Sequence, residues 1–347
     1  MEISAGKLWG LRRMADEGGR FKMTAVDQRP PIKNLVAERR GSETAPYEDV
    51  CAVKALLVKE LAAASSAMLL DPHYAYPSGI QFLSPTKGLI LTLEDSLFEE
   101  TEGGRLSAPI DDWSVEKIKR AGGDAVKVLA WYRPDADASV CTAQQEFTRA
   151  IGEACRRFDI PFVFELLVYP LAADTHQTQD YVEHQNKRPE LVLESVRAFA
   201  APEFGVDLFK LESPIPAEAV PEIGAEGAAE AQALFDALGD AAGRPWVMLS
   251  AGAGKPAFKR ILQYAYRAGA SGYLAGRAIW WEAFQAFPDL DRMAEALRAD
   301  GVPYMDSLNA LTDAEARPWQ THPCYGGTVA LAGGGSDFRR AYTAFGA

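Results

Sequence analysis

Three charged side chains lie within segments whose other residues are mostly apolar. Lys127 lies in AVKVLAWY, Glu165 in FVFELLVYP and Lys210 in DLFKLESP. A charge in a buried segment costs on the order of several kcal/mol unless it is paired, neutralised or used in chemistry. An unprotonated lysine is a nucleophile for carbonyl carbon, so two lysines and a glutamate in one cleft fit imine (Schiff-base) chemistry.

Such chemistry needs neighbours that adjust the protonation of the attacking lysine. A second ammonium group and partial desolvation lower the pKa of a lysine from its usual value of about 10.4, and Lys127 is the candidate for that ammonium. Glu165 can carry protons to and from the carbinolamine, with a pKa raised by apolar neighbours. These neighbours are Phe162, Phe164 and Leu166. The alternative is a structural Lys–Glu–Lys network without chemistry.

Length and charge limit the classes of protein to consider. The chain has 347 residues, within the size range of a single α/β barrel with insertions. Acidic residues number 48 against 36 basic ones, and the net charge of −12 disfavours a nucleic-acid partner. A small anion held in a local basic pocket remains compatible with this balance.

The cysteine spacing and the lengths of the apolar segments indicate in which cellular compartment the protein lies. Four separated cysteines without a CxxC pair suggest neither a zinc ribbon nor a disulfide framework. This pattern indicates a reducing environment. They are Cys51, Cys141, Cys155 and Cys324. The first 19 residues lack the apolar core of a signal peptide, and no uncharged apolar stretch is long enough to span a bilayer. We therefore expect a soluble cytoplasmic protein without a membrane partner, with a homo-oligomer left open.

Short apolar runs alternate with longer amphipathic segments from Phe21 to Ala278, which is typical of repeated β-α units. The eight runs are FKMTAV before Asp27, AMLL before Asp71, GLILT near Glu94, AVKVLA around Lys127, FVFELL around Glu165, LFKL around Lys210, WVMLS up to Ser250 and GYLAG before Arg277. No glycine-rich dinucleotide loop follows the first run, so a closed (β/α)8 TIM barrel is favoured over an open sheet. We predict one barrel domain over residues 1–318 and a Gly-rich C-terminal tail over 319–347.

Helices and loops follow from the residues between the runs. Apolar spacing predicts helices over Tyr47–Ala64, Ala143–Phe158, Glu190–Ala200, Ala225–Leu238 and Pro256–Ala268. Asp95–Asp112 is expected to be a long loop and a candidate lid. The segment after Trp319 is expected to be mobile, because Gly333, Gly334 and Gly335 follow one another.

Polar residues gather at the ends of the predicted strands. Asp27, Lys127, Glu165 and Lys210 fall at or near the carboxyl ends of the first, fourth, fifth and sixth strands, where barrel enzymes place catalytic groups. Asp27 either orients the substrate or forms a salt bridge with one of the lysines.

The last two strands end in glycine-containing turns, LSAGAG and LAGRA, whose amides together with Arg277 can hold a phosphate. Arg29, in VDQRPP, is expected across the barrel mouth as a partner for a second anionic group. A solvated surface arginine is the alternative. The aromatic residues Trp131, Tyr132, Trp280 and Trp281 are assigned to packing.

From Phe21 to Trp281 the sequence resembles the class I tagatose-1,6-bisphosphate aldolases, with the sulfofructose-phosphate aldolases as near relatives. The segments that carry the resemblance are AVDQR, LLDPHYAYP, GDAVKVLAWY, PFVFELLVYP, VDLFKLESP, LSAGAG and AGRAIWW. The resemblance implies that Lys210 forms the Schiff base, that Glu165 is the acid/base, and that Lys127 and Asp27 assist. Substrate and phosphate would be held by Gln28, Arg29, Ser250, Gly252, Gly276 and Arg277.

The implied reaction is reversible cleavage of a phosphorylated ketose, such as tagatose 1,6-bisphosphate, to dihydroxyacetone phosphate and glyceraldehyde 3-phosphate. In it Glu165 also helps to take the C4 hydroxyl proton. Two alternatives stay open: cleavage of 6-deoxy-6-sulfofructose 1-phosphate to sulfolactaldehyde, and a non-enzymatic sugar-phosphate-binding barrel. His73 and DQRPPIKN depart from the tagatose-type pattern near the distal end of the substrate.

No cofactor or metal is expected, since the chain has only His73, His176, His184 and His322 and no paired ligand pattern. Near the C-terminus, Tyr342 resembles the mobile tyrosine of some fructose-bisphosphate aldolases. An incidental aromatic residue is the alternative.

Overall fold

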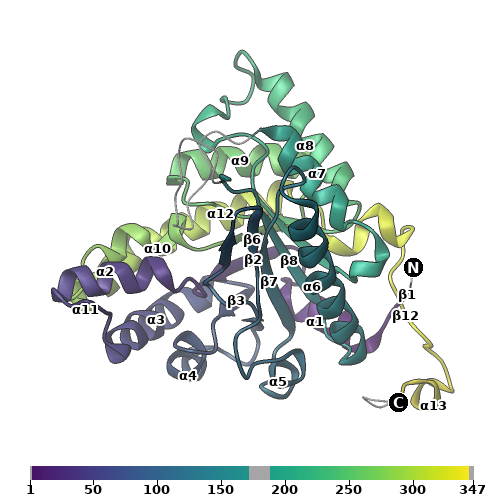
Figure 1. Ribbon diagram of the computed structural model, residues 1–347, viewed down its shortest axis with the longest axis horizontal. Helices are drawn as coiled ribbons and strands as arrows, with labels where there is room; N and C mark the ends of the chain where they lie inside the picture. The colour runs from purple at the N-terminus through teal and green to yellow at the C-terminus, as the bar shows by residue number, and fades with distance from the viewer. Residues whose placement is uncertain (1, 172–187, 344–347) are drawn as a thin grey trace.

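Eight parallel strands close into a barrel in the computed structural model, which describes residues 2–171 and 188–343. In barrel order the strands are β10 (Trp246–Met248), β11 (Gly272–Ala275), β2 (Phe21–Ala25), β3 (Ala67–Leu70), β4 (Gly88–Thr92), β7 (Ala125–Trp131), β8 (Phe162–Leu167) and β9 (Leu208–Leu211). Figure 1 shows these strands at the centre with the helices around them. Each predicted run forms one barrel strand, so the (β/α)8 prediction is confirmed.

Helices connect the strands and cover the outside of the barrel. They are α1 (Ala5–Met14), α2 (Pro30–Arg40), α3 (Tyr47–Leu61), α4 (Ala75–Gly79), α5 (Val115–Arg120), α6 (Ala138–Arg157), α7 (Pro189–Phe199), α8 (Ala228–Ala242), α9 (Lys255–Arg267), α10 (Arg277–Phe284), α11 (Leu290–Ala296), α12 (Val302–Glu315) and α13 (Phe338–Ala341). All five predicted helices are present as α3, α6, α7, α8 and α9. Pro256 lies in the first turn of α9, where its missing N–H is tolerated. Within the described ranges, no helix is long and apolar enough to cross a membrane.

Strand alternation separates an outer core from an inner one. In β8, Phe162, Phe164 and Leu166 belong to the large cluster beneath the helices, whereas Val163 belongs to the cluster inside the barrel. Successive side chains of a strand point to opposite faces, so a charged residue two positions after an inner apolar residue also points inward.

Helix α1 closes the barrel at the amino-terminal ends of its strands. A Cβ atom at Gly10 would lie 2.2 Å from the carbonyl oxygen of Asp124, just before β7, and 2.6 Å from the Pro161 ring, just before β8. Leu11 and Met14 join the inner cluster from the same helix. The helix therefore contacts the strand ends directly at a position where only glycine fits.

The C-terminal segment also lies at this end. The sequence predicts a mobile tail, whereas the described residues are attached: Trp319 and Tyr325 are buried in the inner cluster, and β12 (Ala330–Leu331) pairs with β1 (Glu2–Ile3). Figure 1 shows β1 and β12 side by side at the margin of the barrel. The boundary between residues 318 and 319 stays a prediction.

Tyr342 lies away from the catalytic face. Its hydroxyl donates a hydrogen bond to Asp159 at 2.6 Å, and Asp159 precedes β8 at the amino-terminal end of the barrel. The comparison with a mobile catalytic tyrosine is therefore wrong for the described arrangement, because Lys210 lies towards the carboxyl ends of the strands.

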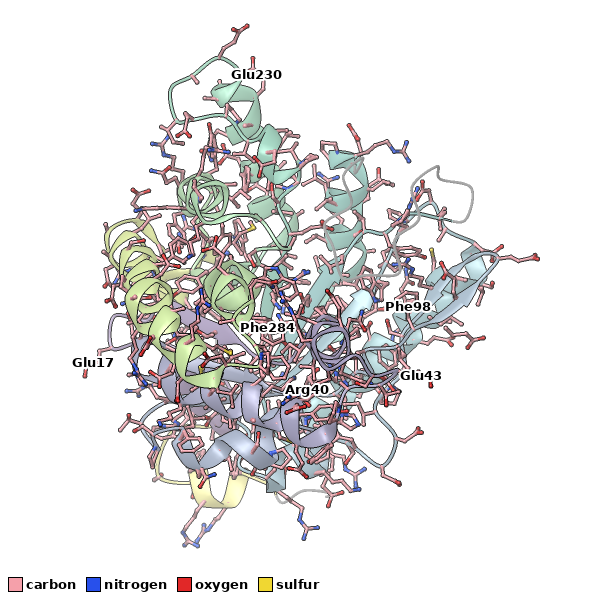
Figure 2. The ribbon with its side chains drawn as sticks, turned by 90° about the vertical axis from the view of Figure 1, so that its left-hand side faces the viewer. Glu17, Arg40, Glu43, Phe98, Glu230 and Phe284 are labelled. Atoms are coloured by element: carbon pink, nitrogen blue, oxygen red, sulfur yellow. The ribbon has the colours of Figure 1, made fainter. Side chains whose placement is uncertain are left out.

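The segment expected to be a long loop after β4 contains a β-hairpin, formed by β5 (Glu99–Thr101) and β6 (Gly104–Leu106). The guanidinium of Arg105 stacks on the rings of Phe98, Trp131 and Tyr169 at 4.2–5.0 Å. In Figure 2 the hairpin projects from the barrel beside the labelled Phe98. A cation held among three aromatic rings orders this segment. A lid role for it stays a prediction.

The packing of α1 predicts the outcome of changing Gly10 to alanine. Alanine normally stabilises a helix by about 1 kcal/mol relative to glycine, but here its Cβ would meet the Asp124 carbonyl. We expect the free energy of unfolding in urea to fall by about 1–3 kcal/mol, as for other overpacked sites. In the control, Gly301→Ala, the glycine also has helical backbone angles and the new Cβ makes contacts no shorter than 3.4 Å, so stability should not fall. A stabilised Gly10→Ala protein would mean that α1 does not rest on the strand ends.

Candidate active site

Four charged residues point into the barrel because of strand alternation. Each lies two positions after an apolar residue of the inner cluster. The pairs are Ala25 and Asp27, Ala125 and Lys127, Val163 and Glu165, and Leu208 and Lys210. Four segments far apart in the chain thus bring the predicted catalytic residues into one layer of the barrel interior.

Lys127 is the centre of this layer. Its Nζ lies 2.9 Å from Asp27 Oδ2, 2.6 Å from Glu94 Oε1 and 2.9 Å from Glu165 Oε2. The side chain is 2% exposed, so three carboxylates, and not water, compensate its charge. Asp27 therefore forms the salt bridge with Lys127 that the sequence left as one of two alternatives.

Lys210 lies on the other side of Glu165. Its Nζ is 2.8 Å from Glu165 Oε2, the same oxygen that contacts Lys127. Glu165 is fully buried, and Lys210 is 3% exposed. The two lysines and the glutamate thus lie together, as the sequence predicts, with one carboxylate oxygen between the two amines.

The charges shift the pKa values of the cluster in opposite directions. Burial raises the pKa of Asp27, but the charges of Lys127 and Lys210 outweigh burial and lower the pKa to about 2. Burial lowers the pKa of Lys127, yet its three carboxylate neighbours raise it well above the usual value. Asp27 is thus held as a carboxylate and Lys127 as an ammonium.

The prediction of a raised pKa for Glu165 is wrong. Burial does raise the pKa, but the charges of Lys127 and Lys210 lower it below the usual value. Phe162 and Phe164, named as its apolar neighbours, lie on the outer face of β8 and belong to the other core cluster. Alternation along the strand separates them from the carboxyl group.

Glu94 is a member of the site that the sequence analysis did not assign. Its Oε1 accepts a hydrogen bond from Lys127 and its Oε2 accepts one from Thr92 at 2.6 Å. Burial raises the pKa of Glu94, and the nearby positive charges of Lys127 and Arg29 offset only part of that rise. Its position just after GLILT, at the end of the third predicted strand, was the signal that could have identified it.

A small cavity opens beside this cluster at the carboxyl ends of β2, β4 and β7. The lining residues are Asp27, Gln28, Arg29, Pro30, Pro31, Glu94, Ser96, Phe98, Lys127, Leu129 and Trp131. Trp131, which the sequence analysis assigned to packing alone, forms part of the cavity wall. The cavity thus borders Lys127 and two of the carboxyls that contact Lys127, those of Asp27 after β2 and Glu94 after β4.

Arg29 is buried in this wall, so the alternative of a solvated surface arginine is wrong. It is 5% exposed, and its Nη2 donates to the backbone carbonyl of Glu94 at 2.8 Å. Its Nε and Nη1 are buried without a hydrogen-bond partner among the described residues. The Arg29 side chain reaches from the end of β2 past β3 to the end of β4. Arg277 follows β11, which lies on the other side of β2, so Arg29 points away from Arg277.

The turns after β10 and β11 form a second polar region. Ala253 donates its N–H to the Ser250 carbonyl at 2.7 Å, and Ala251 and Gly252 both have positive φ angles, 47° and 87°. A Cβ atom at Gly252 would lie 3.5 Å from the guanidinium carbon of Arg277, the first residue of α10. The structure thus brings a glycine turn, a helix N-terminus and an arginine together, a combination suited to an anion.

Gln28 packs against the end of β11. A Cβ atom at Gly276 would lie 2.7 Å from Gln28 Nε2 and 2.7 Å from the Ala25 carbonyl oxygen. Glycine at 276 is therefore required for the close approach of β2 to the start of α10. This contact links the Gln28–Arg29 segment to the Arg277 region.

The histidines do not form a metal site among the residues that the structure describes, where no group of three potential ligands is found. His73 donates its backbone N–H to the Asp71 carboxylate, which also pairs with the buried Lys54. His176 and His184 lie outside the described residues.

Comparison with known proteins identifies relatives over nearly the whole chain. Tagatose 1,6-diphosphate aldolase of Listeria monocytogenes serotype 4b is 34% identical over 330 residues, covering 92% of this chain and 96% of that protein. The protein of the same name from Streptococcus pneumoniae is 34% identical over 332 residues, covering 92% and 99%. The one from Lactococcus lactis is 32% identical over 330 residues, also covering 92% and 99%.

Solved structures share the fold at low sequence identity. A Schiff-base-forming fructose-1,6-bisphosphate aldolase superposes with a TM-score of 0.57 at 17% identity, covering 87% of this chain and 98% of that one. The fructose-bisphosphate aldolase of Plasmodium falciparum superposes with a TM-score of 0.63 at 11% identity, covering 91% and 98%. The model of the DeoC/LacD family aldolases matches residues 21–282. With relatives 34% identical over 92% of its length, the chain belongs to the DeoC/LacD family of aldolases.

Proposed function

We propose that this protein is a class I aldolase that reversibly cleaves tagatose 1,6-bisphosphate to dihydroxyacetone phosphate and glyceraldehyde 3-phosphate. The observation that supports this most is the buried Lys210–Glu165–Lys127 arrangement, with amine-to-carboxylate distances of 2.8 and 2.9 Å. The three relatives described above are named for this substrate.

Lys210 is the nucleophile in this mechanism. Its amine attacks the C2 carbonyl to give a carbinolamine, and loss of water gives a protonated imine. When the C3–C4 bond breaks, its electron pair moves towards the imine and an aldehyde leaves. The enamine of dihydroxyacetone phosphate then takes a proton at C3, and hydrolysis frees Lys210.

Glu165 moves protons at the C2 end of the substrate. Its Oε2 lies 2.8 Å from Lys210 Nζ, so it can accept a proton from the attacking amine and return one to the departing water. The lysine charges that lower its pKa keep it ionised before the substrate binds. Lys127 stays protonated, because three carboxylates raise its pKa, and supplies the second ammonium beside the attacking amine.

The two ends of a bisphosphate have separate partners. The Ser250–Ala253 turn, Gly276 and Arg277 suit the phosphate on the triose that stays bound to Lys210, because turn amides and a guanidinium combine there. Arg29 suits the phosphate at C6, because it lines the cavity and its Nε and Nη1 are buried without a hydrogen-bond partner among the described residues.

Borohydride trapping tests the imine. Incubation with dihydroxyacetone phosphate followed by reduction should add one triose phosphate to the protein, at Lys210 by peptide mass spectrometry. Lys210→Met should abolish trapping and cleavage of tagatose 1,6-bisphosphate. An adduct on Lys127 would reverse the assigned lysine roles, and a binding protein without catalysis would give none.

Removal of metal ions tests whether the imine, and not a bound metal, is the electrophile. Because the imine serves as electron sink, cleavage should survive treatment with EDTA. Loss of activity on chelation, with recovery on adding zinc, would contradict the imine mechanism.

Replacing Arg277 by alanine should weaken binding of phosphorylated substrates in particular. A charge-assisted contact is worth about 1.5–3 kcal/mol, so KM should rise about 10- to 150-fold for the bisphosphate. Unphosphorylated analogues should change little. Arg292→Ala, at an exposed position of α11, is the matched control. An equal effect on both kinds of substrate would show that Arg277 acts on structure instead.

A further inference from the structure

A buried ion pair behind β2 takes no part in the proposed chemistry. Lys54, on α3, pairs with Asp71, which follows β3, and neither side chain has any exposed surface. Helix α3 otherwise packs on the barrel through apolar residues of the large cluster, among them Val53 and Leu57. Replacing a buried ion pair by apolar residues is often neutral or stabilising, so packing alone does not account for two charges at this position.

Lys54 reaches the backbone of the strand that leads into the site. Its Nζ donates a hydrogen bond to the Val26 carbonyl at 2.8 Å. The Val26 N–H donates to the Leu69 carbonyl of β3 at 2.9 Å, so β3 holds the N–H of this residue and Lys54 holds its C=O. The next residue along the chain is Asp27. An ammonium from outside the barrel therefore fixes the peptide unit that precedes a carboxylate of the site.

The segment after Val26 carries two groups of the site. Val26 belongs to the outer cluster beneath the helices, whereas Asp27 points inward and contacts Lys127 at 2.9 Å. Two residues later, Arg29 lines the cavity and donates to the Glu94 carbonyl at 2.8 Å. A displacement of the Val26 carbonyl would move the backbone that carries both Asp27 and Arg29.

Asp71 holds the Lys54 ammonium in place. Its carboxylate accepts hydrogen bonds from the backbone N–H groups of His73 at 3.0 Å, Tyr74 at 2.8 Å and Ala75 at 3.3 Å. These amides belong to the turn between β3 and α4. They fix the carboxylate, and the carboxylate in turn fixes the ammonium behind β2.

We infer that Lys54 is a positioning residue for Asp27 and Arg29, an inference that rests on the proposed aldolase function. Lys54 acts through the Val26 carbonyl and not on the substrate. Displacing a substrate-positioning group by about 1 Å can lower a rate about 100-fold. The contact therefore matters for binding the C6 phosphate through Arg29, whereas Lys210 and Glu165 form the imine from β9 and β8.

Lys54→Met removes the ammonium and keeps an unbranched side chain. For tagatose 1,6-bisphosphate, kcat/KM should fall about 10- to 100-fold, mainly through a higher KM, because Arg29 is displaced. Borohydride trapping with dihydroxyacetone phosphate, and exchange of its C3 proton, should continue. Lys59→Met, at an exposed position of the same helix, is the matched control and should behave like the unmodified protein.

A mutant cycle tests whether Lys54 acts through Arg29. Arg29→Ala should raise KM for the bisphosphate, and adding Lys54→Met should raise it hardly further, because both changes affect the same contact. If the two increases in KM multiply, Lys54 does not act through Arg29.

A second variant separates positioning from support of the fold. Lys54→Met leaves the charge of Asp71 buried without its ammonium, which should lower the urea midpoint of unfolding. Lys54→Met combined with Asp71→Asn removes both charges, and the amide oxygen at position 71 can still accept from His73 and Tyr74. The urea midpoint should return towards that of the unmodified protein. KM should stay high, because the Val26 carbonyl still lacks its donor.

The outcomes distinguish this inference from the aldolase proposal. A normal KM in the double variant, whether or not Lys54→Met alone folds, would overturn the positioning role, because activity would then follow stability. Equal losses of trapping and cleavage would also overturn it. Failure of the unmodified protein to be trapped or to cleave any ketose bisphosphate would instead overturn the aldolase function, and the inference with it.

Discussion

The ion contacts of Lys127 are the interaction on which the site depends. One ammonium group joins carboxylates that follow or belong to three different strands, β2, β4 and β8, while Lys127 itself comes from β7. Removing one partner of a buried ion pair typically costs about 3–5 kcal/mol, because the remaining charge is left uncompensated. The cluster therefore limits how far these strands can shift relative to one another. It also fixes the protonation of Asp27 and Lys127 before any substrate binds.

Apolar layers on both sides strengthen these interactions. Towards the amino-terminal end lies the inner cluster, closed by α1, Trp319 and Tyr325. Towards the carboxyl end, Leu129, Trp131, Leu167, Tyr169 and Leu249 form a smaller cluster around the barrel mouth. Charges between two apolar layers interact more strongly than charges in water, which accounts for opposite pKa shifts in two carboxyls of one cluster. Glu94 and Asp27 differ because Lys210 also acts on Asp27, whereas burial dominates at Glu94.

Strand positions and inward charges could be predicted from the sequence because they depend on local pattern. Each barrel strand is a short apolar run, and Lys127, Glu165 and Lys210 interrupt such runs with a charge. The remaining errors concern contacts between distant segments. The pKa of Glu165 depends on amines from β7 and β9, and Phe162 cannot influence it from the opposite face. The attachment of the tail depends on pairing between β12 and β1, which residues 330–331 alone do not reveal. Glu94 was missed because its contact with Lys127 joins the ends of two strands, β4 and β7, and no local pattern marks that contact.

Lys127 also couples the protonation states of two carboxyls in the site. It contacts Glu165 and Glu94, at 2.9 and 2.6 Å. When one of these carboxyls takes up a proton, it loses its attraction for the ammonium, and Lys127 then interacts more strongly with the other carboxylate and lowers its pKa. Protonation of one carboxyl thus favours the ionised form of the other. When Glu165 takes up a proton during carbinolamine formation, Glu94 and Asp27 still compensate the charge of Lys127, so Lys127 stays protonated beside the reacting amine.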